Sequence, residues 1–144
     1  MAQEIAPIVK SPRVYTNIHV SQIVRYRMPM AAIVSILHRV SGIGLFLFMP
    51  FLIWMFDTSV TSEVSYARFT HLFEAGSGAL GGWFYKLIVL GLIWAFLHHL
   101  IAGLRHVWMD ATHAVSKKFG RQSAQVTLAV SIVLTLALGF KLFF

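Results

Sequence analysis

The chain alternates between three long apolar stretches and shorter polar segments. Residues 30–56, 83–109 and 125–144 are mostly aliphatic and aromatic. Each reaches or approaches the ~20 apolar residues with which a helix crosses the hydrocarbon core of a bilayer. None shows the apolar–polar alternation of a barrel strand, and only helices or closed barrels satisfy all backbone groups in lipid. The pattern therefore predicts an all-α membrane protein with three transmembrane helices.

The polar segments are too short to form further domains. Residues 1–29 form an N-terminal segment, residues 57–82 a turn-rich loop and residues 110–124 a second loop. No internal repeat is visible. The first segment contains Glu4 and lacks the apolar run of a cleaved signal peptide. We therefore expect a mature bacterial protein that inserts through its own first span.

The placement of basic residues predicts the orientation. The segments before the first and third spans are rich in basic residues, namely Lys10, Arg13, Arg25, Arg27, Lys117, Lys118 and Arg121. The other side has fewer, and they are diluted by acidic residues: Arg68, Lys86 and Lys141 against Asp57, Glu63 and Glu74. Because Lys and Arg favour the cytoplasmic side, we expect a cytoplasmic N-terminus and a periplasmic C-terminus. The expected location is the bacterial inner membrane, crossed several times.

The composition excludes several classes of function. Of the 144 residues, 58% are hydrophobic and only 12% are charged, whereas soluble domains carry about 25% charged residues. The net charge of +7 does not indicate nucleic-acid binding, because the basic residues flank apolar spans and form no continuous surface. The absence of cysteine excludes disulfides, iron–sulfur clusters and covalently attached haem. A metal in this chain must therefore be held by histidine.

The first span contains a polar group formed by Ser35, His38 and Arg39. Arg39 lies about 13 Å along the helix from Met30, where an arginine costs several kcal/mol unless it is paired or reaches the headgroups. Ser35 and Arg39 are one turn apart and share a helix face. Alternatively, Arg39 extends to the headgroups and Ser35 bonds to its own helix. That alternative leaves His38 unexplained, so we favour a functional site.

The second span carries the densest cluster of histidines. His99 lies about 16 Å from Asp110 along the helix, near the middle of the bilayer. His99, Gly103 and His106 share one face, and glycine leaves room for a flat ligand. A neutral imidazole beside such a gap is a plausible axial haem ligand, although histidines that bond across helices are an alternative. His98 points roughly 100° away from His99, and its role is open.

Other polar residues have simpler interpretations. Arg39, Arg105 and Asp110 offer charges that can pair with one another or with ligand carboxylates such as haem propionates. We expect His71 and His113 at the surface, and no role is assigned to His19. The third span has no ionisable residue between Arg121 and Lys141, and we expect it to be a packing helix, as we expect Trp94 to be a packing residue.

Two motifs carry a family resemblance. They are Ser35-Ile-Leu-His-Arg-Val-Ser-Gly42 and His99-Leu-Ile-Ala-Gly-Leu-Arg-His106, the latter followed by Asp110. Together with Ser11, Pro12 and Tyr15 and the three-span layout, they resemble the cytochrome b membrane-anchor subunit of succinate dehydrogenase (succinate:quinone oxidoreductase, respiratory complex II). The resemblance covers most of the chain.

The resemblance implies specific roles for these residues. His99 would be an axial ligand of haem b, with the other ligand supplied by a second small membrane subunit. Ser35 and Arg39 would bind ubiquinone, and His38, Arg39 and His106 would surround the haem propionates. The implied partners are this second membrane subunit, an iron–sulfur subunit and a succinate-oxidising flavoprotein, the last two on the cytoplasmic side. The chain alone would not oxidise succinate.

Two other functions compete with this interpretation. One is a small proton or ion transporter that uses His38, Arg39, His99 and Arg105 as a relay, although the inverted repeats and broken helices of many transporters are not evident. The other is the haem anchor of a fumarate reductase. The subunits that co-purify with the chain separate these possibilities.

Overall fold

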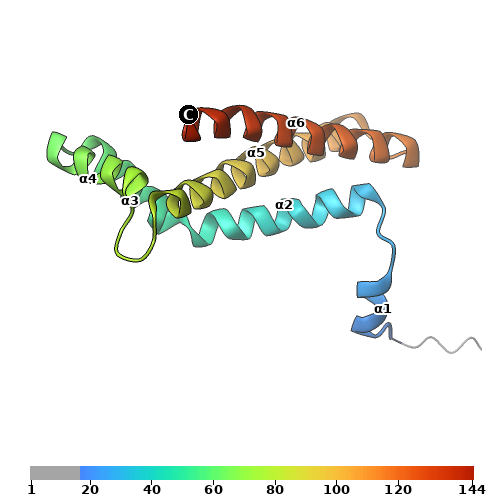
Figure 1. Ribbon diagram of the computed structural model, residues 1–144. Coiled ribbons are helices and arrows are strands. Elements are labelled where there is room, and N and C mark those ends of the chain that lie inside the picture. The colour runs from blue at the N-terminus through green and yellow to red at the C-terminus, as the bar shows by residue number, and fades with distance from the viewer. Residues whose placement is uncertain (1–16) are drawn as a thin grey trace, which may run out of the picture.

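The computed structural model describes residues 17–144, which form six helices (Figure 1). Three are long and apolar enough to cross a membrane: α2 (Met30–Leu47), α5 (Gly82–Thr112) and α6 (Lys117–Phe143). Helix α5 packs against both α2 and α6. The prediction of an all-α chain with three long apolar helices is confirmed.

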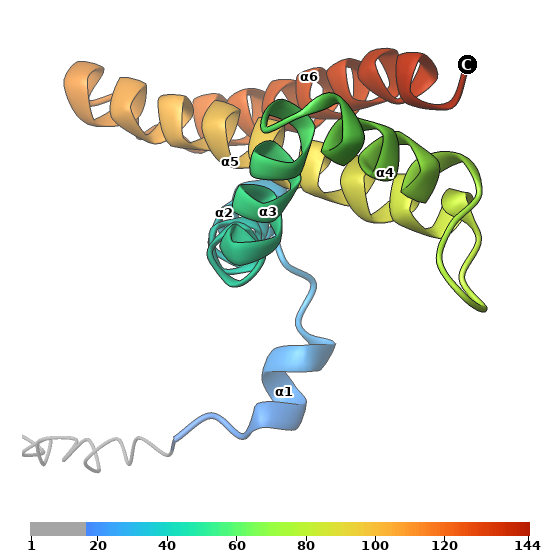
Figure 2. The same cartoon turned by 90° about the vertical axis from the view of Figure 1, so that its left-hand side faces the viewer.

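A short helix, α1 (Val20–Arg25), precedes the bundle and lies apart from it (Figures 1 and 2). His19 caps this helix: its Nδ1 accepts a hydrogen bond from the backbone of Ser21, and its own backbone N–H donates to the side chain of Gln22. The side chain of His19 therefore has a local structural role. Lys10 and Arg13 of the charge pattern, and Ser11, Pro12 and Tyr15 of the resemblance, lie outside the described residues.

The first predicted span is divided between two helices. Helix α2 ends at Leu47, and α3 (Met49–Val60) begins after Phe48, whose φ of −87° and ψ of 3° depart from helical values. Pro50 lies in the first turn of α3. Proline has no N–H, and its ring clashes with the carbonyl four residues earlier. These two effects interrupt a stretch that its apolar composition alone predicts to be continuous.

The segment predicted as a turn-rich loop contains α4 (Glu63–Glu74). Ser62 caps this helix by accepting a hydrogen bond from the backbone N–H of Ser65 at 3.1 Å. Helix α4 packs against α3 and α5 at the end of the bundle far from α1 (Figure 1). The chain then turns tightly at Gly76, where φ is +88° and a Cβ would clash with the carbonyl oxygen of Leu80. Only glycine fits this turn without strain.

The connection between α5 and α6 is shorter than the predicted loop of residues 110–124. Helix α5 continues to Thr112 and ends at His113, whose φ of 53° is left-handed. Helix α6 begins at Lys117, with the Ser116 hydroxyl accepting a hydrogen bond from the backbone N–H of Phe119. The first turns of α6 are therefore helical despite their polar sequence. His113 and His71 are both exposed, as predicted.

A stripe of small and hydroxyl residues packs α6 against the rest of the bundle. The buried residues of α6 recur every three or four positions and are Ala124, Thr127, Ser131, Thr135 and Gly139. Small residues let helices approach closely in membranes. A Cβ on Gly139 would lie 2.7 Å from Cδ1 of Leu90 on α5. The interpretation of the third span as a packing helix agrees with these contacts.

Much of the remaining surface is apolar. Many large hydrophobic side chains are exposed, including Phe46 (76%) and Val133 (62%). Among the described residues, the buried hydrophobic ones are only Val34, Ala95, Ala102 and Ala124. A soluble chain of this size rarely exposes such continuous apolar surface. The helices are therefore suited to a lipid environment or to partner helices.

Candidate functional site

Three imidazole rings meet where α2 packs against α5. The rings of His38 and His99 are stacked, with centroids 4.2 Å apart and planes 13° from parallel. The ring of His106 lies 5.3 Å from that of His38 and is tilted by 56°. The structure thus brings together the histidines of the two motifs, which are far apart in the sequence.

The hydrogen bonding of His99 defines its tautomer. Its Nδ1 lies 2.9 Å from the backbone carbonyl oxygen of His38. A carbonyl oxygen can only accept, so Nδ1 must carry the proton and donate it. The lone pair of the neutral ring is then on Nε2. This is the form in which a histidine binds a metal through Nε2, with its other nitrogen held by a carbonyl.

Gly42 provides the close approach between His99 and α2. A Cβ on this glycine would lie 2.8 Å from Cε1 of His99, closer than two carbon atoms can pack. The space predicted beside Gly103 is bordered by the ring of His38, since a Cβ there would lie 3.5 Å from its Nε2, at ordinary contact distance. The sequence shows Gly42 within the first motif, but it does not show which imidazole ring packs against this glycine. That depends on how α2 packs on α5.

His98 faces the interior of the bundle. Its side chain is completely buried, and its Nδ1 lies 3.4 Å from the hydroxyl of Ser131 on α6. Its ring stacks on Trp94 with centroids 5.3 Å apart, so Trp94 is a packing residue as expected. Within residues 17–144, its buried Nε2 has no hydrogen-bond partner. The two adjacent histidines therefore have different environments: His98 is enclosed by this chain, whereas His99 is only partly buried.

Arg105 joins α5 to the start of α6. Its Nε donates to the hydroxyl of Ser123 at 2.9 Å, and its Nη2 donates to the carbonyl of Gly120 at 3.2 Å. The side chain is only 9% exposed. Within the described residues Arg105 does not pair with Asp110, because its guanidinium is bonded to neutral groups of α6. Its pairing with a ligand carboxylate stays a prediction. Asp110 itself is exposed.

Ser35 differs from the other serine and threonine residues of the long helices. Ser41, Thr127, Ser131 and Thr135 each donate to a carbonyl of their own helix. The hydroxyl of Ser35 has no hydrogen bond within the described part of the chain, and its side chain is partly exposed. The alternative in which Ser35 bonds to its own helix is therefore not supported. Arg39, one turn further along the same helix, is exposed.

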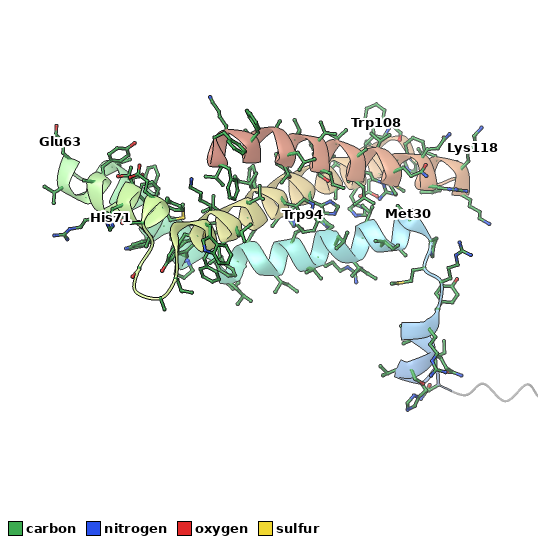
Figure 3. The ribbon with its side chains drawn as sticks, in the orientation of Figure 1. Met30, Glu63, His71, Trp94, Trp108 and Lys118 are labelled. Atoms are coloured by element: carbon green, nitrogen blue, oxygen red, sulfur yellow. The ribbon has the colours of Figure 1, made fainter. Side chains whose placement is uncertain are left out.

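The charged ends of the bundle differ. Figure 3 shows Met30, Trp108 and Lys118 at one end and Glu63 and His71 at the other. Exposed basic residues of the described chain gather near the first end, namely Arg25, Arg27, Lys117, Lys118 and Arg121. The imidazole cluster begins about 12 Å from Met30, since His38 is eight residues further along the helix.

These features define a class of protein: a helical membrane protein whose first two long helices meet at a cluster of partly buried imidazoles. Comparison with known proteins gives the family. The family described as "Succinate dehydrogenase/Fumarate reductase transmembrane subunit" matches residues 16–138. The chain therefore belongs to this family of transmembrane subunits of an oxidoreductase complex, and the family resemblance is confirmed.

Individual relatives agree with this assignment. The chain is 33% identical to a protein of Paracoccus denitrificans over 109 residues, which are 76% of this chain and 78% of the relative. It is 35% identical to a protein of Coxiella burnetii over 115 residues, 80% of this chain and 87% of the relative. It is 26% identical to a protein of Rickettsia felis over 113 residues, 78% of this chain and 82% of the relative. Each relative is named succinate dehydrogenase cytochrome b556 subunit.

Proposed function

We propose that this chain is the membrane-anchoring cytochrome b subunit of a succinate:ubiquinone oxidoreductase, in which electrons from succinate pass to ubiquinone. The relatives' names support a cytochrome b. The observation that carries the proposal is the bond from Nδ1 of His99 to the carbonyl of His38. This bond leaves Nε2 as the ligand nitrogen on a partly exposed side chain.

The residues of the cluster fit a haem b shared with a second small membrane subunit. His99 would supply one axial ligand, and the second subunit would supply the other. With the other ligand supplied by the second subunit, this chain would need to supply only one histidine to hold the haem. When bound, the haem supplies a one-electron carrier. His38, Arg39 and His106 would lie around the propionates, where a guanidinium and imidazole N–H groups bind carboxylates.

Ser35 and Arg39 would bind ubiquinone. Its reduction takes two electrons and two protons, and negative charge develops on the carbonyl oxygens. A hydroxyl without an internal partner can donate to one oxygen, and a guanidinium one turn away stabilises the charge. Because arginine remains protonated, Arg39 would act electrostatically, and the protons would arrive through water or a side chain of a partner.

The basic end of the bundle supports a proposed orientation. We place the N-terminus in the cytoplasm and the C-terminus in the periplasm, because Lys and Arg favour the cytoplasmic side of the inner membrane. The flavoprotein and iron–sulfur subunits would dock at this end. The quinone site would then lie near the side from which electrons and protons arrive.

The assignment of the haem ligand is tested by optical spectra of the purified complex. Reduced-minus-oxidised spectra should show Soret and α bands that are lost in His99→Ala. The matched control is His98→Phe. It replaces the adjacent histidine, whose side chain faces α6, and it should keep both bands. Bands that survive in His99→Ala and disappear in His98→Phe would reverse the assignment.

The quinone site is tested by two activities of the same complex. Ser35→Ala and Arg39→Ala should each lower succinate:ubiquinone reductase activity by roughly tenfold to a hundredfold, because each removes a group that interacts with the charge developing on the quinone. Succinate oxidation by an artificial acceptor should persist. Ser59→Ala and Arg68→Ala, on α3 and α4, are the controls and should leave both activities unchanged. Equal loss of both activities in an assembled complex contradicts the assigned roles.

The partners distinguish this proposal from its alternatives. An affinity tag on the chain should recover a flavoprotein, an iron–sulfur subunit and a second small membrane subunit. A recovered complex that reduces fumarate from quinol faster than it oxidises succinate would identify a fumarate reductase anchor. Haem-free chain that supports ion flux in liposomes would favour the transporter, for which Arg105 is poorly placed because its guanidinium is bonded to α6.

A further inference from the structure

The stretch of α2 that follows His38 forms a seat for the ring of His99. The carbonyl oxygen of His38 accepts from Nδ1 of His99 at 2.9 Å and from the hydroxyl of Ser41 at 2.9 Å. The hydroxyl of Ser41 also lies 3.4 Å from the same Nδ1. Ser41 is only 3% exposed. The three polar groups therefore form a closed triangle inside the helix interface.

The ring of His99 is also confined by its neighbours in space. The imidazole of His38 stacks on one face at 4.2 Å. The backbone of Gly42 approaches its edge so closely that a Cβ would lie 2.8 Å from Cε1. Adding that Cβ must push the ring away from α2. Such a shift lengthens the hydrogen bond on Nδ1 and redirects Nε2, because both nitrogens flank Cε1.

We propose that Ser41 and Gly42 are positioning residues that set the direction and the electron density of the His99 imidazole. This inference rests on the proposed role of His99 as a haem ligand. Gly42 allows the ring to reach the carbonyl, and the carbonyl fixes the proton on Nδ1. Ser41 shares the same carbonyl and so limits how strongly that oxygen polarises the N–H of the ring.

The role of Ser41 leads to a directional expectation. Without its hydroxyl, the carbonyl of His38 has one donor fewer and becomes a stronger acceptor for Nδ1–H. The imidazole then becomes more electron-rich, as metal-bound histidines do when their second nitrogen is held more strongly. A more electron-rich axial ligand favours the ferric state. Ser41→Ala should therefore lower the midpoint potential of the haem.

The role of Gly42 is tested with a matched glycine on the same helix. Gly42→Ala should change the low-spin electron paramagnetic resonance signal of the oxidised complex or reduce its haem content. Gly44→Ala makes the same change two residues further along, where a Cβ meets nothing within 4 Å, and should leave the signal unchanged. Identical signals in the two assembled variants would overturn the role of Gly42.

If the complex with Gly42→Ala does not assemble, Ser41→Ala still tests the inference. This substitution only removes the hydroxyl oxygen and adds no atom to the helix interface. Redox titration should give a lowered potential with the low-spin signal retained, and Ser59→Ala should titrate like the unsubstituted complex. An unchanged or raised potential contradicts the role of Ser41. Low-spin haem that persists in His99→Ala would instead refute the ligand assignment, so failure of the proposed function and failure of this inference are distinguishable.

Discussion

The tie between Arg105 and α6 gives a prediction about stability. Arg105→Met keeps a long, flexible side chain but removes the bonds to the Ser123 hydroxyl at 2.9 Å and to the Gly120 carbonyl at 3.2 Å. Ser123→Ala removes only the first of these bonds. The two substitutions and their combination form a double-mutant cycle that isolates the contact between α5 and α6.

The expected coupling follows from the geometry. Hydrogen bonds between transmembrane helices contribute about 0.6 kcal/mol on average and up to about 1.7 kcal/mol, and charged donors contribute about 1.5–3 kcal/mol in proteins generally. The guanidinium is nearly buried and its bond to Ser123 is short. We therefore expect a coupling of about 1–2 kcal/mol. Arg105→Met alone should cost more than the coupling, since it also removes the bond from the guanidinium to the Gly120 carbonyl.

The assay is equilibrium unfolding of the full chain in mixed micelles, with loss of helical circular dichroism followed as sodium dodecyl sulfate is added. The control cycle pairs Ser123→Ala with Arg121→Met, because Arg121 is exposed on the same helix. The control coupling should be close to zero. If the Arg105–Ser123 coupling free energy is no larger than that of the control cycle, the hydrogen bond between Arg105 and α6 is refuted. Arg105 would then be available to a ligand or a proton relay.

Three further comparisons test the packing in the same assay. His98→Ala should destabilise the chain by about 2–4 kcal/mol because it leaves a cavity. His98→Phe should cost much less, because the larger ring fills the site and the unpaired buried nitrogen is removed. Equal losses of stability in the two variants would contradict this. Gly139→Leu should separate α5 from α6 and lower stability, while Gly91→Leu, which points into open space, should not. Gly76→Ala should cost about 1 kcal/mol or more because its φ is positive, and a neutral result would mean that the turn adapts.

Much of the fold could be predicted from the apolar runs. The three long helices correspond to runs whose length and composition require burial in lipid or protein. The break at Phe48 was missed because Pro50 interrupts a stretch that remains apolar on both sides. Helix α4 was missed because its amphipathic sequence is short and lies among turn residues. The early start of α6 was missed because its first turns are polar and resemble a loop in the sequence. The structure shows the helix cap at Ser116 that begins the helix there.

The site was predicted less completely. Spacing along α5 placed His99 and His106 on one face, and the family resemblance linked them to His38. The partner of each side chain depends on how the helices are rotated against one another, and one sequence carries little information about that rotation. The enclosure of His98 by Ser131, the tie of Arg105 to Ser123 and the seat at Gly42 therefore emerged only from the structure. The small and hydroxyl residues that recur every three or four positions in α6 are a sequence signal that could have indicated the first of these contacts.

The central claim is that His99 presents Nε2 to a haem. It is tested most directly by removing the His99 side chain and supplying free imidazole in its place. In the purified complex, His99→Gly should lose the low-spin electron paramagnetic resonance signal, and added imidazole should restore it by entering the space left by the side chain. His98→Phe should keep the signal without imidazole. A His99→Gly complex that retains the original signal in the absence of imidazole would contradict the claim.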